Sequence, residues 1–328
     1  MRGCGSLTAC SRNRRRDSRA EAGKAVARVT KMRLGFIGLG NIGGAIAANL
    51  AADGHALRVH DPDAARADRL ASAGAAVVAS AAEVARGSGI TFVSVPTPAI
   101  MESVADEWLA ASDPDAVLID LTTNAPETVR RVGARIAGAG RHLLECPLTG
   151  GAPGAKARML TFIVGGEAAV FERCKPLLAT VGRAIFHLGP LGTGNVGKLV
   201  NSIFAFTTTW VSLEGLAVCA KSGIDLRTMV EMVRAGGGGN LFIDRMVEGI
   251  NERGRPTDFA LELAAKDAGL LLDVARDLGV PTPVAAEVAQ ALVAAKAFGL
   301  GGRDFTEIVE VVERLAGVKL HLAPPRAS

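Results

Sequence analysis

The sequence predicts an α/β fold with two domains, in which a mostly parallel sheet comes first and an all-helical domain follows. Its 328 residues exceed what a single hydrophobic core usually holds, so two domains are expected. From Arg33 onward, short apolar runs alternate with alanine-rich stretches, which is the pattern of βαβ units around a parallel sheet. After Gly194 the strand pattern ends, and a long apolar stretch at 198–221 opens a series of helical periods.

Short β-branched and apolar runs mark the strands of the first domain. We expect them at 34–38, 56–61, 76–79, 90–95, 116–121, 142–146, 160–165 and 184–188. The second domain is expected to contain the long helix and further helices at 226–234, 259–278, 284–298 and 305–315. Segments rich in glycine or proline separate these further helices.

The arginine-rich segment that opens the chain is interpreted separately. It lacks the long apolar run of a secretory signal, while an arginine-rich transit peptide stays open as an alternative. Asp17 and Glu21 interrupt its positive charge, and Met32 stands directly before the first expected strand. We therefore expect a disordered extension, a sheet domain, a helical domain and a flexible tail, at 1–31, 32–192, 193–318 and 319–328.

The composition argues against several classes of function. The formal net charge is +4, and the arginine-rich residues 1–31 account for this excess, so no nucleic-acid partner is expected. The five cysteines are scattered, with no CxxC pair and no histidines at ligand spacing, which argues against a disulfide framework and a metal site. This cysteine usage favours a reducing, cytoplasmic location.

The apolar stretch at 198–221 has the length of a membrane span but not its composition. Lys198, Asn201, Glu214 and Lys221 interrupt it, and no charge asymmetry flanks it. We expect a buried helix that joins the domains and packs at a subunit interface, in a homodimer or homotetramer with no membrane partner.

A dinucleotide site is predicted at the turn after the first strand. The segment GLGNIG follows a strand and opens an amphipathic helix at 42–53, which is the context of a Rossmann-type domain. Gly38 permits the tight turn, Gly40 lets the backbone approach a pyrophosphate, and Gly43 lets the helix lie close to the strand. A glycine-rich turn without a ligand is the alternative. The residues expected to contact the cofactor are Gly38, Leu39, Gly40, Asn41, Ile42 and Gly43.

Residues at the ends of later strands are expected to extend this site. Asp61 ends the second strand, where its carboxylate can accept hydrogen bonds from ribose hydroxyls and would repel a 2′-phosphate, which favours NAD over NADP. A simple capping role for Asp61 in the turn at Pro62 is the alternative. Val95 and Pro96 form an extended rim that can line the cofactor, and Thr123 offers a hydroxyl near the nicotinamide ribose.

Two later segments predict the chemistry. Thr149, Gly150 and Gly151 form a loop whose hydroxyl and N–H groups can bind a carboxylate. Lys198 and Asn201 stand one helical turn apart on one face, and burial would lower the pKa of Lys198 and make it a usable proton donor or acceptor. A solvated or ion-paired lysine is the alternative.

Four ordered motifs resemble the β-hydroxyacid dehydrogenases, the group of 3-hydroxyisobutyrate dehydrogenase and tartronate semialdehyde reductase. The resemblance spans about 33–315, and its first domain would be like the NAD-binding domain of 6-phosphogluconate dehydrogenase. The motifs are GLGNIGGAIAANL at 38–50, PLTGGAPGA at 147–155, GTGNVGKLVN at 192–201 and the pair Lys266-Asp267.

The resemblance implies a role for each of these segments. Lys198 would be the catalytic acid/base, Asn201 would position the substrate, and Lys266 would lie in the cleft near cofactor or substrate. The loop of Thr149, Gly150 and Gly151 would hold the substrate carboxylate. The implied reaction is hydride transfer between NAD, or NADP, and a small 3-hydroxy acid or its semialdehyde, with the helical domain contributing to substrate binding and dimerisation.

The chain also departs from the family pattern. Thr149 stands where a serine is usual, Arg158 replaces a glycine and adds a cation near the loop, and Ser202 stands where many members have a second asparagine. These changes leave the substrate open. Reduction of an imine or another carbonyl is one alternative, although related imine reductases generally lack the lysine; a non-catalytic dinucleotide-binding protein is another.

Overall fold

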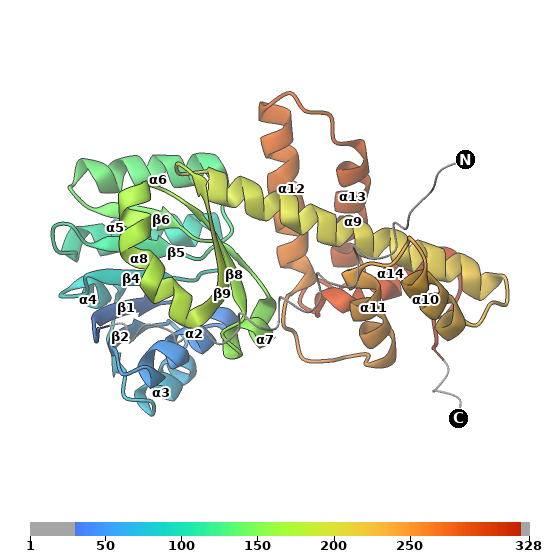
Figure 1. Cartoon of the computed structure of the whole chain (residues 1–328), viewed down its shortest axis with the longest axis horizontal. Coiled ribbons are helices and arrows are strands. Elements are labelled where there is room, and N and C mark those ends of the chain that lie inside the picture. The colour runs from blue at the N-terminus through green and yellow to red at the C-terminus, as the bar shows by residue number, and fades with distance from the viewer. Residues whose placement is uncertain (1–29, 323–328) are drawn as a thin grey trace, which may run out of the picture. The chain divides into compact units, whose positions relative to one another are not determined.

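A nine-stranded sheet organises the first part of the protein, whose computed structural model describes residues 30–322 (Figure 1). Neighbouring strands follow the order β3-β2-β1-β4-β5-β6-β8-β7, and β9 pairs with β8. The strands are β1 (Arg33–Ile37), β2 (Ala56–His60), β3 (Ala76–Val77), β4 (Ile90–Val93), β5 (Val117–Asp120), β6 (His142–Glu145), β7 (Leu148–Thr149), β8 (Leu160–Gly165) and β9 (Gly182–Gly189). β1 to β6 pair in parallel, whereas β8 is antiparallel to β6 and β7. The strand order changes direction at β1, the place where doubly wound sheets bind ligands.

The register brings the carboxyl ends of parallel strands to one edge of the sheet. Ile37 at the end of β1 is paired with Val93 at the end of β4. Val93 is in turn paired with Asp120 of β5, and Asp120 with Glu145 of β6. The loops that follow these strands therefore lie next to one another, although their residues are far apart in the sequence.

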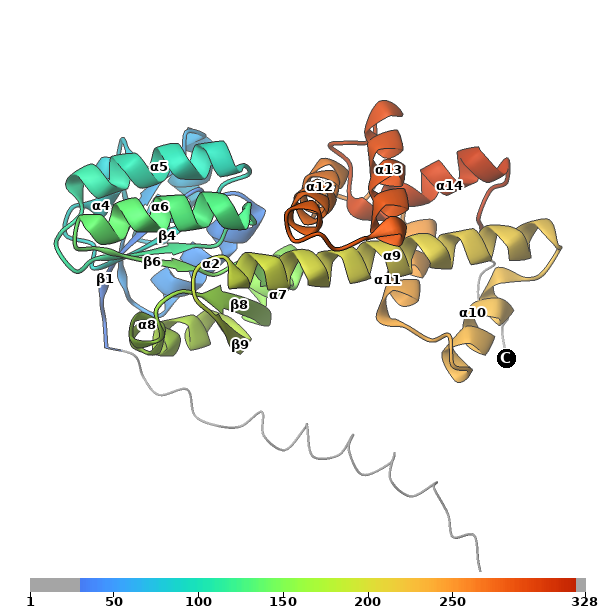
Figure 2. The same ribbon diagram turned by 90° about the horizontal axis from the view of Figure 1, so that it is seen from above.

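Helices cover both faces of the sheet and enclose two separate cores (Figure 2). One face is covered by α4 (Ala81–Ala85), α5 (Pro98–Ala111) and α6 (Pro126–Gly138). These helices contribute the buried side chains of Val84, Trp108 and Ile136, respectively, to the core on this face. The other face is covered by α2 (Asn41–Ala52), α3 (Ala64–Ala71), α7 (Gly151–Lys156) and α8 (Ala168–Val181). Burial of these apolar faces is the main force that holds the layers together.

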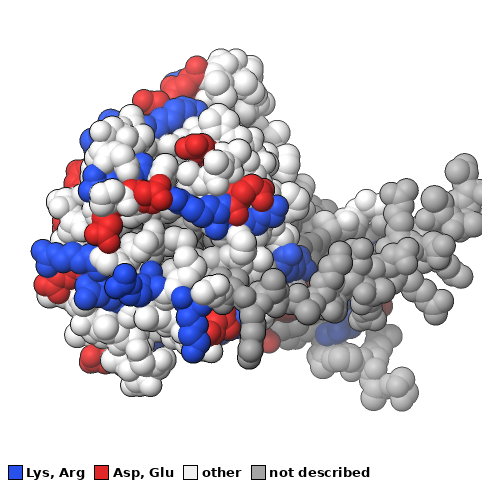
Figure 3. All heavy atoms as spheres, turned by 60° about the vertical axis from the view of Figure 1, so that its left-hand side comes forward, with Lys and Arg blue, Asp and Glu red and all other residues white. Residues whose placement is uncertain are grey.

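The outer surface of the sheet domain carries charges of both signs. Glu102 of α5 accepts hydrogen bonds from Arg131 and Arg135 of α6, each with a shortest distance of 2.9 Å. Figure 3 shows basic and acidic side chains next to one another on this side of the molecule. Such exposed pairs contribute little to stability, because solvent screens them.

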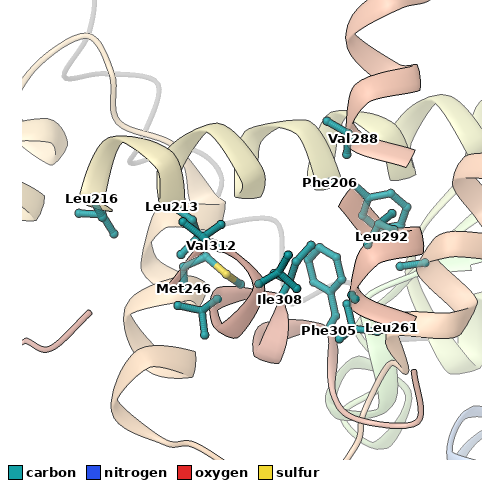
Figure 4. Close-up of a cluster of buried hydrophobic side chains, with 14 of the residues drawn as sticks. Phe206, Leu213, Leu216, Met246, Leu261, Val288, Leu292, Phe305, Ile308 and Val312 are labelled. Atoms are coloured by element: carbon teal, nitrogen blue, oxygen red, sulfur yellow. The ribbon is translucent and has the colours of Figure 1, made fainter. Parts of the chain in front are cut away.

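The residues after β9 form a helical domain around one long helix. Its elements are α9 (Thr193–Lys221), α10 (Leu226–Ala235), α11 (Leu241–Asn251), α12 (Leu261–Asp277), α13 (Pro283–Ala297), the 3₁₀ helix η1 (Phe305–Ile308) and α14 (Val309–Ala316). Phe206 of α9 packs on Phe305 with ring centroids 5.2 Å apart, and Leu213 and Met246 extend the same core (Figure 4).

Within the described residues, α9 is the helix that is long and apolar enough to cross a membrane, with a mean hydropathy of 1.5 in its most apolar window. Its residues Leu199, Phe206 and Leu213 nevertheless belong to the helical core, and 33% of that window is buried. Core helices of folded proteins can be equally long and apolar, so the length and composition of α9 are weak evidence that it crosses a membrane.

The structure confirms the predicted fold class and differs from the sequence-based elements in detail. β7 has two residues, too few to produce a pattern, and is not predicted. The helix α11 is not predicted either, although Asn240 caps it and apolar residues recur at Ile243, Met246 and Ile250. The apolar repeat of α11 begins directly after the glycine-rich segment that was interpreted as the end of a helix.

The two ends of the helical domain also differ from expectation. α9 begins at Thr193 rather than at residue 198, because a carboxylate of the sheet domain caps its first turn. Leu320 and Leu322 are buried in the helical core, so the described part of the predicted tail is packed. The predicted extension, up to residue 29, and residues 323–328 lie outside the described residues.

Candidate active site

The glycine turn between β1 and α2 is tightly packed at both ends and open in the middle. A Cβ atom added to Gly38, whose φ is 88°, would lie 2.2 Å from the carbonyl oxygen of Ser94. A Cβ added to Gly43 would lie 2.1 Å from the carbonyl oxygen of Gly38. By contrast, among the described residues no atom other than those of its chain neighbours lies within 4 Å of the position that a Cβ of Gly40 would take. Gly38 and Gly43 therefore allow strand and helix to approach closely, while Gly40 leaves open space above the turn.

This open space suits the pyrophosphate of a dinucleotide. Gly40 is the N-cap of α2, and no side chain caps the helix there. The first N–H groups of α2, including those of Asn41 and Ile42, have no partner within the helix, and their partial positive charge attracts anions. The residues present at the turn therefore fit a nicotinamide dinucleotide.

Asp61, directly after β2, is buried and contacts the glycine turn. Its carboxylate accepts hydrogen bonds from the Leu39 N–H at 2.6 Å and from the Asp63 N–H at 2.9 Å. Arg66 lies 3.8 Å away. Asp61 thus caps its own turn, as the sequence-based alternative expected, and also holds the dinucleotide turn in place. Its contact with a ribose stays a prediction.

The ends of β4 and β5 lie beside this turn. The Val95 N–H donates to Thr122 Oγ1 at 3.2 Å, which joins the two loops. Pro96 is exposed, and the next residue, Thr97, caps α5 through a 3.3 Å hydrogen bond to the Ile100 N–H. Val95 and Pro96 therefore form a rim at the carboxyl edge of the sheet, next to the predicted cofactor position.

Lys198 lies close to a charged pair on α12. Lys266 Nζ donates to the carbonyl oxygen of Thr123 at 2.7 Å and lies 3.2 Å from Asp267 Oδ1. Asp267 is buried and accepts a hydrogen bond from Ser202 Oγ of α9 at 3.4 Å. The loop after β5, the start of α9 and the middle of α12 therefore meet at one place.

The surroundings of Lys198 change its acidity. Burial lowers the pKa of Lys198, the negative charge of Asp267 opposes this effect, and the positive charge of Lys266 lowers the pKa further. A lysine with a lowered pKa can release and regain a proton nearer to neutral pH than a solvated one. The site therefore offers a group that can take part in proton transfer.

The structure distinguishes the two residues that follow Lys198 by one helical turn. Asn201 is exposed, whereas Ser202 is buried and faces Asp267. Ser202, at spacing i+4, is thus the residue that contacts the charged neighbours of Lys198. The predicted substrate contact of Asn201 stays a prediction.

The loop after β6 has the backbone that carboxylate binding would need. Gly150 has a φ of 123° and Gly151 a φ of 64°, values that favour glycine. Thr149 is half-buried and pairs with Thr161 of β8. On β8, Ile163 Cγ2 lies 3.1 Å from the position that a Cβ of Gly197 would take, so α9 packs against the strand that pairs with β7.

Arg158, which replaces the glycine usual in the family, forms contacts within the sheet domain. Its guanidinium group forms an ion pair with Asp53 at 2.7 Å and donates to the carbonyl oxygens of Asn49 and Thr180 at 3.0 and 2.9 Å. These contacts tie the turn after α7 to α2 and to the end of α8. The cation that Arg158 adds near the loop is therefore engaged within the fold.

Two buried carboxylates next to the site were not predicted as functional. Glu145 accepts hydrogen bonds from the first residues of α9, and Asp120 lies beside it on β5. Burial raises the pKa of Glu145 and raises that of Asp120 to about 7. Each residue is the last of its strand, which marks a position at the carboxyl edge of the sheet but not the partners that the side chain contacts there.

The described residues hold no group of three or more His, Cys, Asp or Glu side chains that could bind a metal. Cys146, Cys174 and Cys219 are buried free thiols, while Cys4 and Cys10 lie outside the described range. Two surface hollows of about 370 and 360 Å³ lie in the helical domain, and neither is lined by a predicted site residue.

Comparisons with known proteins agree with this geometry. Residues 33–189 match the family model described as the NAD binding domain of 6-phosphogluconate dehydrogenase. Residues 192–312 match the model described as NAD-binding of NADP-dependent 3-hydroxyisobutyrate dehydrogenase. Together the two matches cover both domains.

Individual relatives support the same family assignment. The chain is 35% identical to 3-hydroxyisobutyrate dehydrogenase of Pseudomonas aeruginosa, over 77% of this chain and 88% of that protein. It is 32% identical to 2-hydroxy-3-oxopropionate reductase of Escherichia coli, over 88% of this chain and all of that protein. The solved structure of Mycobacterium tuberculosis 3-hydroxyisobutyrate dehydrogenase with L-serine superimposes with a TM-score of 0.81 at 26% identity, over 86% of this chain and 99% of that chain. Four solved imine reductase structures share the fold at 17–21% identity.

Proposed function

Because the chain belongs to the β-hydroxyacid dehydrogenase family and is an NAD(P)-dependent enzyme acting on CH–OH groups, we propose that Lys198 is its acid/base and a small 3-hydroxy acid its substrate. The observation that carries the proposal is the position of Lys198, half-buried on α9 beside Asp267 and Lys266. A lysine in these surroundings exchanges a proton more readily than a solvated one.

When bound, NAD(P) would accept the hydride in the direction of oxidation. As the C–H bond of the alcohol breaks, its electron pair leaves with the hydride, and the hydroxyl proton moves to Nζ of Lys198. In reduction, Lys198 returns the proton to the carbonyl oxygen while the hydride arrives at carbon. Asp267 stabilises the charged form of Lys198, and the loss of one proton and one hydride balances the reaction.

The loop of Thr149, Gly150 and Gly151 would bind the substrate carboxylate. One hydroxyl and the N–H groups of two glycines in left-handed conformations suit an anion of this size. Lys266, which donates to the carbonyl oxygen of Thr123, would contribute a positive charge between cofactor and substrate. We propose NAD rather than NADP, supported by the Asp61 carboxylate beside the turn, which would repel a 2′-phosphate.

A second copy of this chain is the proposed partner at α9. Phe204, Val211 and Val218 are 68%, 57% and 67% exposed, and their seven-residue spacing puts them on one face of the helix. An exposed apolar stripe of this kind is typical of a surface that packs against another protein. Light scattering would measure the mass in solution, and a monomer at micromolar concentration would contradict the homodimer or homotetramer.

The catalytic proposal is tested with Lys198→Ala. We expect turnover to fall by about 10² to 10⁴, because general acid–base catalysis contributes effects of that size. Binding of NADH, measured by fluorescence titration, should stay within about twofold. Lys175→Ala, at a lysine of α8 that pairs with Glu172, serves as the matched control.

The assay uses a panel of 3-hydroxy acids, semialdehydes and cyclic imines, each with NAD and NADP. Unimpaired turnover by Lys198→Ala would defeat the assigned mechanism. Activity on imines alone would move the protein to imine reduction, and binding of NADH without any turnover would make it a non-catalytic dinucleotide-binding protein. A clear preference for NADPH would overturn the role given to Asp61.

A further inference from the structure

The carboxylate of Glu145 connects the sheet to the beginning of the helix that carries Lys198. Oε1 accepts hydrogen bonds from the N–H groups of Gly192 at 2.5 Å and Gly194 at 2.9 Å. Oε2 accepts from the N–H of Asn195 at 3.0 Å and from its Nδ2 at 2.5 Å. Glu145 is completely buried, and its four partners are all donors, as an ionised carboxylate requires.

The backbone around the Glu145 carboxylate is packed so closely that the carboxylate has no room to shift. A Cβ added to Gly165 of β8 would lie 2.1 Å from Glu145 Oε1. A Cβ added to Gly194 would lie 2.8 Å from both the Gly165 nitrogen and the Ile163 carbonyl oxygen. Two glycines thus allow β6, β8 and α9 to meet in direct contact around the carboxylate.

Asn195 continues the connection to the cofactor side of the site. Its Oδ1 accepts a hydrogen bond from the N–H of Asn124 at 2.7 Å, and Asn124 Nδ2 donates to Asp120 Oδ2 at 2.6 Å. The residue before Asn124 is Thr123, whose carbonyl oxygen accepts from Lys266. The first turn of α9 is therefore held from β6 by Glu145 and from the loop after β5 by Asn124.

Lys198 follows Asn195 by three residues, about 4.5 Å along the helix axis. Any shift of the first turn of α9 would displace Lys198 by a similar amount, because a helix moves as a rigid element over one turn. We propose that Glu145 and Asn195 are positioning residues, which hold the first turn of α9 so that Lys198 lies at a fixed place beside the carboxyl edge of the sheet. This inference rests on the acid/base role of Lys198 proposed above.

The need to cap the first turn of α9 does not by itself explain why the capping carboxylate comes from a distant strand. The side-chain caps of α5 and α10 come from the residue directly before each helix, Thr97 and Asp225, whereas α12 and α13 have no side-chain cap. For α9 the cap comes from Glu145, 47 residues before Gly192 and on another element. A cap from a distant strand fixes the helix relative to the sheet, which a local cap cannot do.

The variants Glu145→Gln and Asn195→Ala test the proposal in the full-length protein. Each is expected to lower kcat by about tenfold or more, because displacements near 1 Å at a catalytic group have effects of that size or larger. The Kd for NADH should change by less than about twofold, since the glycine turn is untouched. Hydrogen exchange of the amides at 192–198 should become faster in both variants.

Glu313→Gln is the matched control. Glu313, on α14 of the helical domain, is also a buried carboxylate that accepts a backbone hydrogen bond, from Leu320, and it forms ion pairs with Arg253 and Lys319. The variant Glu313→Gln should lower the melting temperature, whereas its kcat, corrected for the folded fraction, should stay unchanged. Glu145→Asp, which keeps the charge and shortens the side chain, should recover part of the activity lost in Glu145→Gln.

The outcomes separate the two proposals. If Lys198→Ala is inactive but both positioning variants keep wild-type kcat, the positioning role is wrong and the acid/base role stands. If kcat falls only in proportion to the folded fraction, as in the control, the positioning role is also wrong. If Lys198→Ala keeps full turnover, the function proposed for Lys198 fails, and the positioning role fails with it.

Discussion

The glycine turn and the start of α9 are two parts of one site that are built in different ways. The turn consists of the consecutive residues 38–43, and its shape follows from local backbone rules. The start of α9 is assembled from β5, β6, α9 and α12, and its buried polar groups depend on one another. A site formed by one continuous turn can therefore be predicted from a sequence motif. For a site assembled from several distant elements, the sequence reveals only the residue that is most unusual in its local context.

Substitutions in the glycine turn should have the largest effect and should separate folding from binding. Gly43→Ala places a Cβ 2.1 Å from the carbonyl oxygen of Gly38, so the backbone must move. We expect it to lower the free energy of unfolding by about 3 kcal/mol, the cost of overpacking a rigid contact. Denaturant unfolding without dinucleotide measures this loss.

Gly40→Ala is the matched variant in the same turn. Apart from its chain neighbours, no atom of the residues that the structure describes lies within 4 Å of the added Cβ, so the free energy of unfolding should change by about 0.5 kcal/mol or less. The Kd for NADH should rise by about tenfold or more, because the methyl group occupies the space into which a pyrophosphate fits. Wild-type affinity in Gly40→Ala would show that the open space is not the dinucleotide site.

The same contrast explains what could be predicted from the sequence. The order of strands and helices and the glycine turn follow from periodicity and from one contiguous motif. Lys198 could be singled out because a lysine is unusual in an apolar stretch. Glu145 and Asn195 could not, since their partners are 47 or more residues away and become neighbours only through the strand order. The choice between Asn201 and Ser202 likewise depends on the rotation of α9 against α12, which no local pattern determines.

The charges around Lys198 should shift the pH dependence of activity in opposite directions. Oxidation requires the neutral amine, so its rate should rise with pH up to the lowered pKa of Lys198, and the rate of reduction should fall over the same range. Removing the carboxylate in Asp267→Asn lowers the pKa of Lys198 further and moves the oxidation profile to lower pH. Removing the ammonium in Lys266→Gln moves it to higher pH.

The measurement is kcat/KM for oxidation as a function of pH in the three proteins. Burial lowers the pKa of Lys198 in all of them, so the two variants isolate the effects of its neighbours. Shifts in the same direction, or no shift in either variant, would contradict the assignment of the titrating group to Lys198.

The buried carboxylates at the start of α9 should also make stability depend on pH, which the uncharged glycine turn cannot do. The pKa of Asp120 is raised from 3.8 to about 7 by burial. Between these values the folded protein binds more protons at this residue than the unfolded chain does, so stability falls as the pH rises. From pH 5 to pH 7 the loss due to Asp120 should be about 2 kcal/mol.

Asp120→Asn removes this titration, so the difference in unfolding free energy between variant and wild type should change by that amount over pH 5 to 7. Urea unfolding at several pH values measures it, and the subtraction cancels the other titrating groups. Asp304→Asn is the control, because hydrogen bonds to Asp304 outweigh the effect of burial and lower its pKa, so its contribution is lost only at acid pH. A constant difference for Asp120→Asn would mean that Asp120 is already ionised at pH 5. The hydrogen bonds from Thr122 and Asn124 would then outweigh its burial, and the start of α9 would be held by two negative charges rather than by one.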